Sequence, residues 1–353
     1  MFPPILIEGF EDNGNGNTIF YSFLEGTTKS ASLVRSIKDI IKAVHKAGLH
    51  ILATVCDQGT TNVSAIRTLV ADTKANYLKS GKSFNENVFA IDGKEVIPIY
   101  DPPHLLKGIR NNFLTKNIGY VNEAGTKCIV TWNDVIKAYK IDAPSARLRL
   151  LRKITDFHVL PSKIKKIKVA YCTQVFSKQY TATITRMSHD RSQSIDGSLT
   201  MTDSAIHTAY LLSFFDDLFD SVNGTARRNF SKPLRNVVTN ESQHIHFWNK
   251  AIKLLQNIRF LDAIGRWANS PPLLKNWILT LQSFKLLHKK IRDMGYTNFS
   301  PRSFNQDPLG NYFGQIRMCG GRNISPSPTA FSHFFKGLLA LIGFCRAKKA
   351  DMF

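Results

Sequence analysis

Three short segments carry the side chains that could do chemistry. Asp57 follows a run of apolar residues, His104, Lys107 and Arg110 recur at three-residue steps, and Asp307 stands before a proline. A carboxylate at the end of a buried strand is suited to bind a divalent cation, and basic side chains along one helical face are suited to contact phosphates. The plainer alternatives are a turn aspartate at Asp57 and a helix cap or packing residue at His104.

The residues around Asp57 predict an alternation of helices and strands. Apolar residues recur at three- and four-residue steps over 33–44, which predicts a helix that Gly48 ends. The apolar run 49–56 predicts a buried strand, and a second helix is expected to begin near Asn62. A further strand is predicted over 96–100. This order favours a mixed α/β sheet, in which functional residues collect at the carboxyl ends of strands.

Past Asn117 the sequence pattern becomes almost wholly helical. From Trp132 to about Trp277 the longest periodic stretches are 164–187, 205–222 and 246–258. Prolines near 271 and 301 interrupt this region. The sequence therefore predicts an α/β part, a long helical part and a short C-terminal part.

The charge of the chain favours a polyanionic partner. Lys and Arg number 47 against 26 Asp and Glu, which gives a formal net charge of +21. Nucleic acid is the expected partner, and a basic but solvated surface is the plainer alternative. Lys163, Lys165, Lys166 and Lys168 alternate with isoleucines, as in a nuclear-import patch or the solvated face of a helix.

The cysteines and the apolar runs indicate in which cellular compartment the protein is expected. Five cysteines lie apart without a Cys-x-x-Cys pair, so neither a disulfide framework nor a zinc site is expected. Neither a signal peptide nor an apolar run of membrane-spanning length is recognised in the sequence. An intracellular protein without a membrane partner is therefore expected.

Five segments, in the same order along the chain, resemble the P-element transposases and the THAP-domain proteins related to them. They are CDQGTTN at 56–62, DPPHLLKGIRNN at 101–112, QVFS at 174–177, LFDSVNG at 218–224 and NQDPLGNYFGQIR at 305–317. The resemblance implies a truncated RNase H-like core, interrupted by a mainly α-helical insertion domain of the GTP-binding type. The implied ranges are 1–117 for the N-terminal part of the core, without its first strand, 118–278 for the insertion domain and 279–353 for the C-terminal part of the core.

The resemblance also implies a set of metal-binding carboxylates, which this sequence carries only in part. The family's Asp-Gly-Met triplet does not occur in the chain. The second aspartate maps onto Asp57, an ancestral metal ligand, while Gly310 stands where the family pattern Asp-x-Leu-Glu-Asn has its glutamate. Asp307, expected to cap a helix with Pro308 as its first residue, is assigned an accessory role. The family implies Mg²⁺ or Mn²⁺, with weak or no binding expected here.

Nucleotide binding rests on the resemblance alone. The family's insertion domain is associated with guanine nucleotides, but the chain has neither a Gly-x-x-x-x-Gly-Lys-Ser/Thr loop nor an Asn-Lys-x-Asp motif. GTP is therefore expected only by resemblance, and no residue is assigned to it. DNA as partner, a homo-oligomer and a nuclear location are the remaining expectations.

The leading hypothesis is a transposase-derived protein that is catalytically defective and retains nucleic-acid binding at most. The first alternative is an active metal-dependent transposase or nuclease whose missing residues are supplied upstream. The second is a nucleotide-binding or protein-interaction module, and the third is a fragment under no functional demand.

Overall fold

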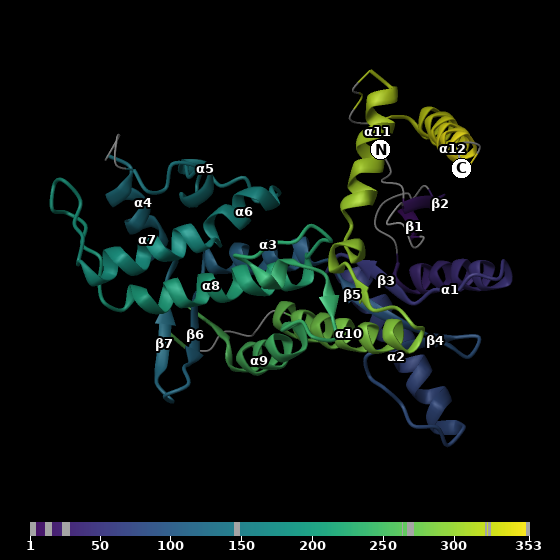
Figure 1. The fold of residues 1–353 in the computed structure, drawn as a ribbon, viewed down its shortest axis with the longest axis horizontal. Coiled ribbons are helices and arrows are strands. Elements are labelled where there is room, and N and C mark those ends of the chain that lie inside the picture. The colour runs from purple at the N-terminus through teal and green to yellow at the C-terminus, as the bar shows by residue number, and fades with distance from the viewer. Residues whose placement is uncertain are drawn as a thin grey trace. The chain divides into compact units, whose positions relative to one another are not determined.

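The computed structural model describes residues 5–10, 16–22, 29–144, 149–262, 264–266, 272–321, 323 and 326–350. The chain divides into two compact units (Figure 1). The smaller unit consists of Met1–Ser36 and Asn305–Phe353, and the larger is Ile37–Phe304. Helix α1 (Ser30–Lys46) crosses from the first unit into the second.

The smaller unit contains segments from both ends of the chain. Strand β1 (Ile5–Phe10) pairs antiparallel with β2 (Gly16–Ser22). The helices of this unit are α11 (Asp307–Cys319) and α12 (Pro328–Ala350). Four apolar side chains pack into a small core between these helices, namely Tyr312, Ile316, Phe331 and Phe335.

A three-stranded sheet begins the larger unit. Strands β3 (Ala53–Cys56) and β4 (Phe89–Ile91) flank the central β5 (Lys94–Tyr100), parallel and antiparallel to it respectively. Asp92 and Gly93 join β4 to β5 with positive φ angles of 51° and 76°. Such a two-residue turn matches the twist of a hairpin and favours Asp-Gly.

Three helices are associated with this sheet. Helix α2 (Thr60–Lys79) follows β3, and α3 (Pro102–Phe113) follows β5. Helix α10 (Leu273–Asp293) returns to β5 late in the chain. The Ser283 hydroxyl donates to the Pro98 carbonyl at 2.6 Å, which fixes this helix against the central strand.

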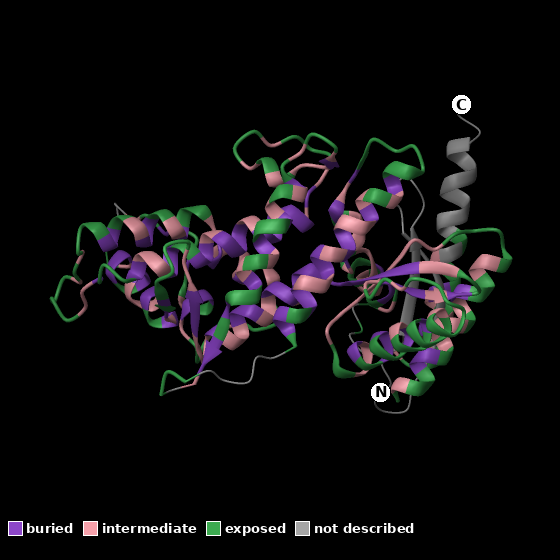
Figure 2. Ribbon diagram, turned by 90° about the horizontal axis from the view of Figure 1, so that it is seen from below, coloured by how far each residue is buried: buried purple, intermediate pink, exposed green. Residues whose placement is uncertain are grey.

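A second sheet and a group of helices make up the middle of the chain. Strand β6 (Asn117–Val121) lies between β7 (Lys127–Val130) and β9 (Arg259–Leu261), antiparallel to both. The helices here are α4 (Trp132–Asp142), α5 (Asp156–Val159), α6 (Val169–Val175), α7 (Lys178–His189) and α8 (Ala205–Val222). Most residues of helix α8 are buried. Figure 2 shows how buried and exposed residues are distributed over the ribbon.

The remaining elements are short apart from one helix. They are α9 (His244–Asn257), the paired strands β8 (Val238–Thr239) and β10 (Asn298–Phe299), and two 3₁₀ turns, η1 (Pro233–Arg235) and η2 (Pro301–Phe304). Within the described part of the chain, no helix is both long and apolar enough to cross a membrane.

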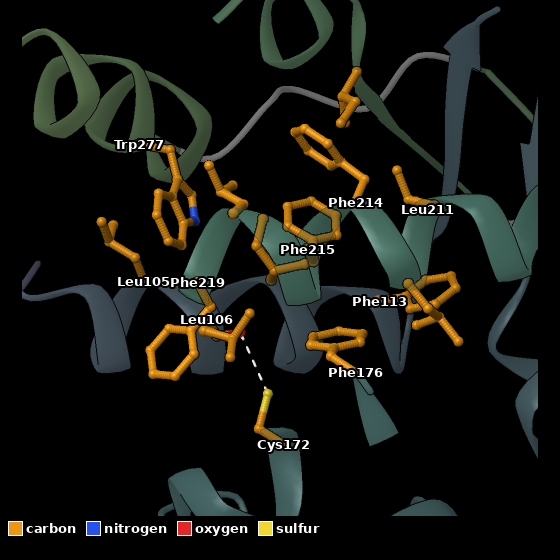
Figure 3. Close-up of a cluster of buried hydrophobic side chains, with 14 of the residues drawn as sticks. Leu105, Leu106, Phe113, Cys172, Phe176, Leu211, Phe214, Phe215, Phe219 and Trp277 are labelled. Atoms are coloured by element: carbon orange, nitrogen blue, oxygen red, sulfur yellow. Dashed lines mark hydrogen bonds between the residues drawn. The ribbon is translucent and has the colours of Figure 1, made fainter. Parts of the chain in front are cut away.

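The core of the larger unit joins helices that are distant in sequence (Figure 3). Leu105 and Leu106 of α3 lie opposite Phe215 and Phe219 of α8, and all four are buried. Cys172 of α6 reaches the same region, where its Sγ lies 3.6 Å from the carbonyl oxygen of Leu106. These contacts fix α3, which carries three of the candidate site residues.

The elements agree with the sequence predictions in type more closely than in length. The helix over 33–44 is confirmed as part of α1, and Gly48 after it has a φ of 84°. The strand predicted from residue 49 begins only at Ala53. The stretch 164–187 is divided, because Ser177 adopts an extended conformation and its hydroxyl caps α7 by accepting from the Tyr180 amide.

The mixed α/β class is confirmed, with small sheets and many helices. The compact units do not follow the expected ranges 1–117, 118–278 and 279–353, since residues 37–304 cluster together. Those ranges stay predictions about evolutionary domains.

Candidate functional site

Two aspartates lie at the carboxyl ends of adjacent parallel strands. Cys56 and Tyr100 face each other as the last residues of β3 and β5, and Asp57 and Asp101 come directly after them. The Asp101 amide donates to the Cys56 carbonyl at 2.8 Å, so the ladder continues into the turn. Both carboxylates therefore belong to one edge of the sheet, where metal and phosphate sites collect in α/β folds.

Asp57 shapes the turn into α2. Its Oδ1 accepts from the Gly59 amide at 2.8 Å and from Asn62 Nδ2 at 2.7 Å. This is the local bonding of a turn aspartate, the plainer alternative named from the sequence. Within the part of the chain that the structure describes, Oδ2 of Asp57 accepts no hydrogen bond, so one oxygen remains available to a cation.

Asp101 is the residue that the sequence analysis missed. Its side chain is 1% exposed and caps α3, with Oδ2 accepting from the His104 amide at 3.0 Å. The same oxygen lies 2.5 Å from His104 Nδ1. An aspartate at the end of a predicted strand, followed by Pro-Pro at a helix start, was the signal available in the sequence.

Close packing holds α3 against the Asp57 turn. Gln58 Nε2 donates to the His104 carbonyl at 3.1 Å. A Cβ added at Gly108 would lie 2.5 Å from Gln58 Nε2 and 2.9 Å from Leu273 Cδ1, so a side chain there would have to displace the ends of these two side chains. Glycine at this position therefore permits the approach of the two elements.

The charges of Asp57 and Asp101 affect the pKa values of Lys107 and Cys56. Burial lowers the pKa of Lys107, while the negative charges of Asp101 and Asp57 oppose that shift. Burial, with the same two carboxylates adding to it, raises the pKa of the Cys56 thiol to about 12. The Cys56 thiol is therefore protonated at neutral pH.

The three residues expected to share an exposed face of α3 do not share one. The His104 side chain is 41% exposed and Lys107 is half-buried, but Arg110 is only 1% exposed. The Arg110 guanidinium donates to the Lys166 carbonyl at 2.8 Å and to Asn111 Oδ1 at 2.8 Å. The expected face is therefore wrong at Arg110, because this side chain points into the protein; nucleic-acid binding by His104 and Lys107 stays a prediction.

Asp307 and Gly310 lie in the smaller unit, in the first turns of α11. The expected cap at Asp307 is corrected, since Gln306 takes the cap position and Asp307 is the first helical residue. The Asp307 amide instead donates to Asn305 Oδ1 at 3.0 Å. Gly310 is an ordinary helical residue, and a Cβ added to it would meet nothing within 4 Å.

The carboxylates of the larger unit do not by themselves fit a two-metal centre. Asp57 has one oxygen in the turn, and Asp101 is buried against His104. Among the residues that the structure describes, no group of three or more His, Cys, Asp or Glu side chains is arranged to hold a metal ion.

Comparison with known proteins finds similarity to one family and to one transposase. The family described as "TNP-like, GTP-binding insertion domain" matches residues 103–237, from α3 to the loop after α8. The transposable element P transposase of Drosophila melanogaster is 23% identical over 310 residues, which are 84% of this chain and 36% of that protein. The chain thus spans little more than a third of the length of this relative.

A solved structure shares the fold. The Drosophila P element transposase strand transfer complex matches with a TM-score of 0.69 and 20% identity, over 95% of this chain and 74% of the solved chain. These findings agree with the five sequence segments, and the chain is similar to the P-element-type transposases.

Proposed function

We propose that the chain is a transposase-derived protein that binds nucleic acid and does not cut it. Its fold is an RNase H-like core interrupted by the helical insertion domain, and Asp57 and Asp101 mark the edge of that core where the ancestral site lay. The position of Gly310 carries the proposal, because a residue without a side chain stands where the family resemblance expects a metal-binding glutamate.

The loss of cutting rests on charge and geometry together. Two-metal catalysis needs several carboxylates that hold both ions against the attacking and leaving oxygens. Asp57 offers one oxygen outside its turn, and Gly310 offers none. We therefore expect weak binding of Mg²⁺ or Mn²⁺ through Asp57 and no strand cleavage.

The net charge of +21 supports nucleic-acid binding. Proteins with such an excess bind phosphates and release condensed counterions, so affinity falls steeply with salt. The similar solved structure is described as a strand transfer complex, which is consistent with a DNA partner for the shared fold. A nuclear location and assembly into a homo-oligomer belong to the same proposal.

Titration of the whole chain with two unrelated DNA duplexes at 50 and 200 mM salt tests this function. The expected result is similar affinity for both duplexes and a steep loss of affinity at the higher salt. Affinity that is insensitive to salt, or strongly selective for one duplex, contradicts the proposal.

A second candidate function is the binding of a guanine nucleotide by the insertion domain. It is favoured by the match of residues 103–237 to a family described as GTP-binding. A fluorescent GTP analogue should bind saturably and be displaced by GTP but not by ATP. Absence of saturable binding by the folded chain removes this candidate.

A further inference from the structure

The segment 149–171, which contains α5 and the start of α6, concentrates positive charge on the surface. Between residues 149 and 171 the chain has seven Lys and Arg residues and one acidic residue, Asp156. Six of the basic side chains belong to exposed residues and are here called the basic ridge: Arg152, Lys153, Lys163, Lys165, Lys166 and Lys168. All belong to the larger unit.

Within the described residues, most of this charge has no carboxylate partner. Asp156 pairs with Lys163 at 2.6 Å and accepts from the Tyr139 hydroxyl at 2.8 Å. Among the described residues, no carboxylate lies within ion-pair distance of Lys165, Lys166 or Lys168. An anion that approaches the basic ridge therefore meets cations without an internal counter-ion.

Aromatic rings position two of the ammonium groups. Lys165 Nζ lies 4.8 Å from the centroid of the Phe157 ring, and Lys168 Nζ lies 5.5 Å from that of Tyr171. Phe157 is 45% exposed, so the ring holds its cation at the surface. These contacts assign the two rings a role in supporting the cations.

The backbone that carries the lysines is tied to the core. The Arg110 guanidinium, 1% exposed, donates to the Lys166 carbonyl at 2.8 Å. Backbone bonds from the Lys163 amide to the Leu160 carbonyl, at 2.8 Å, and from the Lys168 amide to the Lys165 carbonyl, at 3.1 Å, form the turns of the segment. An ordered loop loses less conformational entropy when it binds.

We propose that the basic ridge is the main phosphate-contacting surface of this chain and binds the backbone of nucleic acid irrespective of sequence. Arg110 acts through the ridge by holding the Lys166 backbone, and it makes no phosphate contact of its own. The proposal rests on the nucleic-acid binding proposed above and assigns that binding to one place.

The test compares two charge-matched variants of the whole chain. The first, K165Q/K166Q/K168Q, removes three ridge lysines, and the control, K250Q/K253Q/K275Q, removes three exposed lysines of α9 and α10. All six positions are on the surface, so both variants should remain folded by circular dichroism. Affinity for one fluorescent duplex is measured at 50 and 200 mM salt.

Each lost phosphate contact should lower the salt slope by about 0.9, which reduces the fall in affinity between these salt concentrations about 3.5-fold. Loss of all three contacts in the ridge variant corresponds to about 40-fold, whereas the control should change by no more than one contact. Equal changes in both variants would overturn the proposal in favour of diffuse charge. No salt-dependent binding by the unmodified chain would instead overturn the proposed function.

Arg110→Met tests whether Arg110 supports the ridge by holding the Lys166 backbone. It should lower the salt slope in the unmodified chain but have little further effect in K165Q/K166Q/K168Q, because the contacts that it supports are already gone. The same decrease in both backgrounds would show that Arg110 does not act through the ridge lysines.

Discussion

Replacement of Lys232 by methionine should destabilise the insertion domain strongly at neutral pH. Lys232 Nζ lies 2.8 Å from Asp216 and 2.7 Å from Asp220, both on α8. The two carboxylate side chains are 8% and 9% exposed, and that of Lys232 is 24% exposed. Without the ammonium group, two like charges would remain side by side in a largely buried place.

Breaking a buried ion pair by removal of one partner costs about 3–5 kcal/mol. The lower end, about 3 kcal/mol, is expected here, because Lys232 keeps some solvent contact and Arg235 Nε lies 4.0 Å from Asp220. The matched control is Lys178→Met, which removes the salt bridge between Lys178 and Asp217. Asp217 lies on α8, like Asp216 and Asp220. The Lys178 and Asp217 side chains are 46% and 33% exposed, so loss of this salt bridge should cost about 0–1 kcal/mol.

The stability lost in Lys232→Met should depend on pH with a definite sign. Burial raises the pKa of Asp216 above its ordinary value, and Lys232 opposes that shift. In Lys232→Met the opposition is lost, so the pKa rises further. A carboxyl group whose pKa is raised by folding destabilises the folded state fully above its folded pKa. This penalty decreases as the pH falls below the folded pKa and is gone below the unfolded pKa. The difference in the free energy of unfolding between Lys232→Met and the unmodified chain should therefore become smaller at acidic pH.

Urea unfolding followed by tryptophan fluorescence measures these effects, since the indole of Trp248 is buried and donates to Ser221 on α8 at 3.0 Å. Asp216→Asn and Asp220→Asn together should recover most of the stability lost in Lys232→Met. The reasoning is refuted if Lys232→Met is no more destabilising than Lys178→Met at pH 7, or if the difference does not shrink in acid.

Three further substitutions test the local geometry. Gly224→Ala should destabilise the chain by about 1–3 kcal/mol or more, because the added Cβ would overlap the Asn236 carbonyl oxygen, a backbone atom. Unchanged urea unfolding would contradict this. Asp101→Ala removes the cap of α3 and should cost about 0.5–2 kcal/mol in the same assay, with no loss as the contrary result. Gly310→Ala should stabilise α11 by about 1 kcal/mol, seen as roughly fivefold slower amide hydrogen exchange there, and faster exchange would show that the glycine is structurally required.

Local patterns in the sequence predicted the parts of the fold that depend on local interactions. The periodicity of 205–222 corresponds to α8, and the run 96–100 lies within β5. The turn at Asp57 also depends on near neighbours, since its partners Gly59 and Asn62 are two and five residues away. Such contacts are encoded in consecutive residues and can be recognised without the rest of the chain.

Long-range packing could not be predicted in the same way. The Tyr100 amide donates to Thr280 Oγ1, 180 residues later, and no local pattern shows that α10 returns to β5. Arg110 was expected on an exposed face because it follows His104 and Lys107 at three-residue steps along one helix. Its burial depends on the Lys166 carbonyl, 56 residues away, and thus on the fold of the insertion domain.

The most direct test of the account is a strand-cleavage assay with the purified chain, a labelled DNA duplex and Mg²⁺ or Mn²⁺. The account predicts no metal-dependent nicking or strand transfer, and none after Gly310→Glu alone, because one added carboxylate does not rebuild a two-metal centre. Asp57→Asn serves as the matched control. Metal-dependent nicking by the unmodified chain that disappears in Asp57→Asn would contradict the central claim and show an active nuclease.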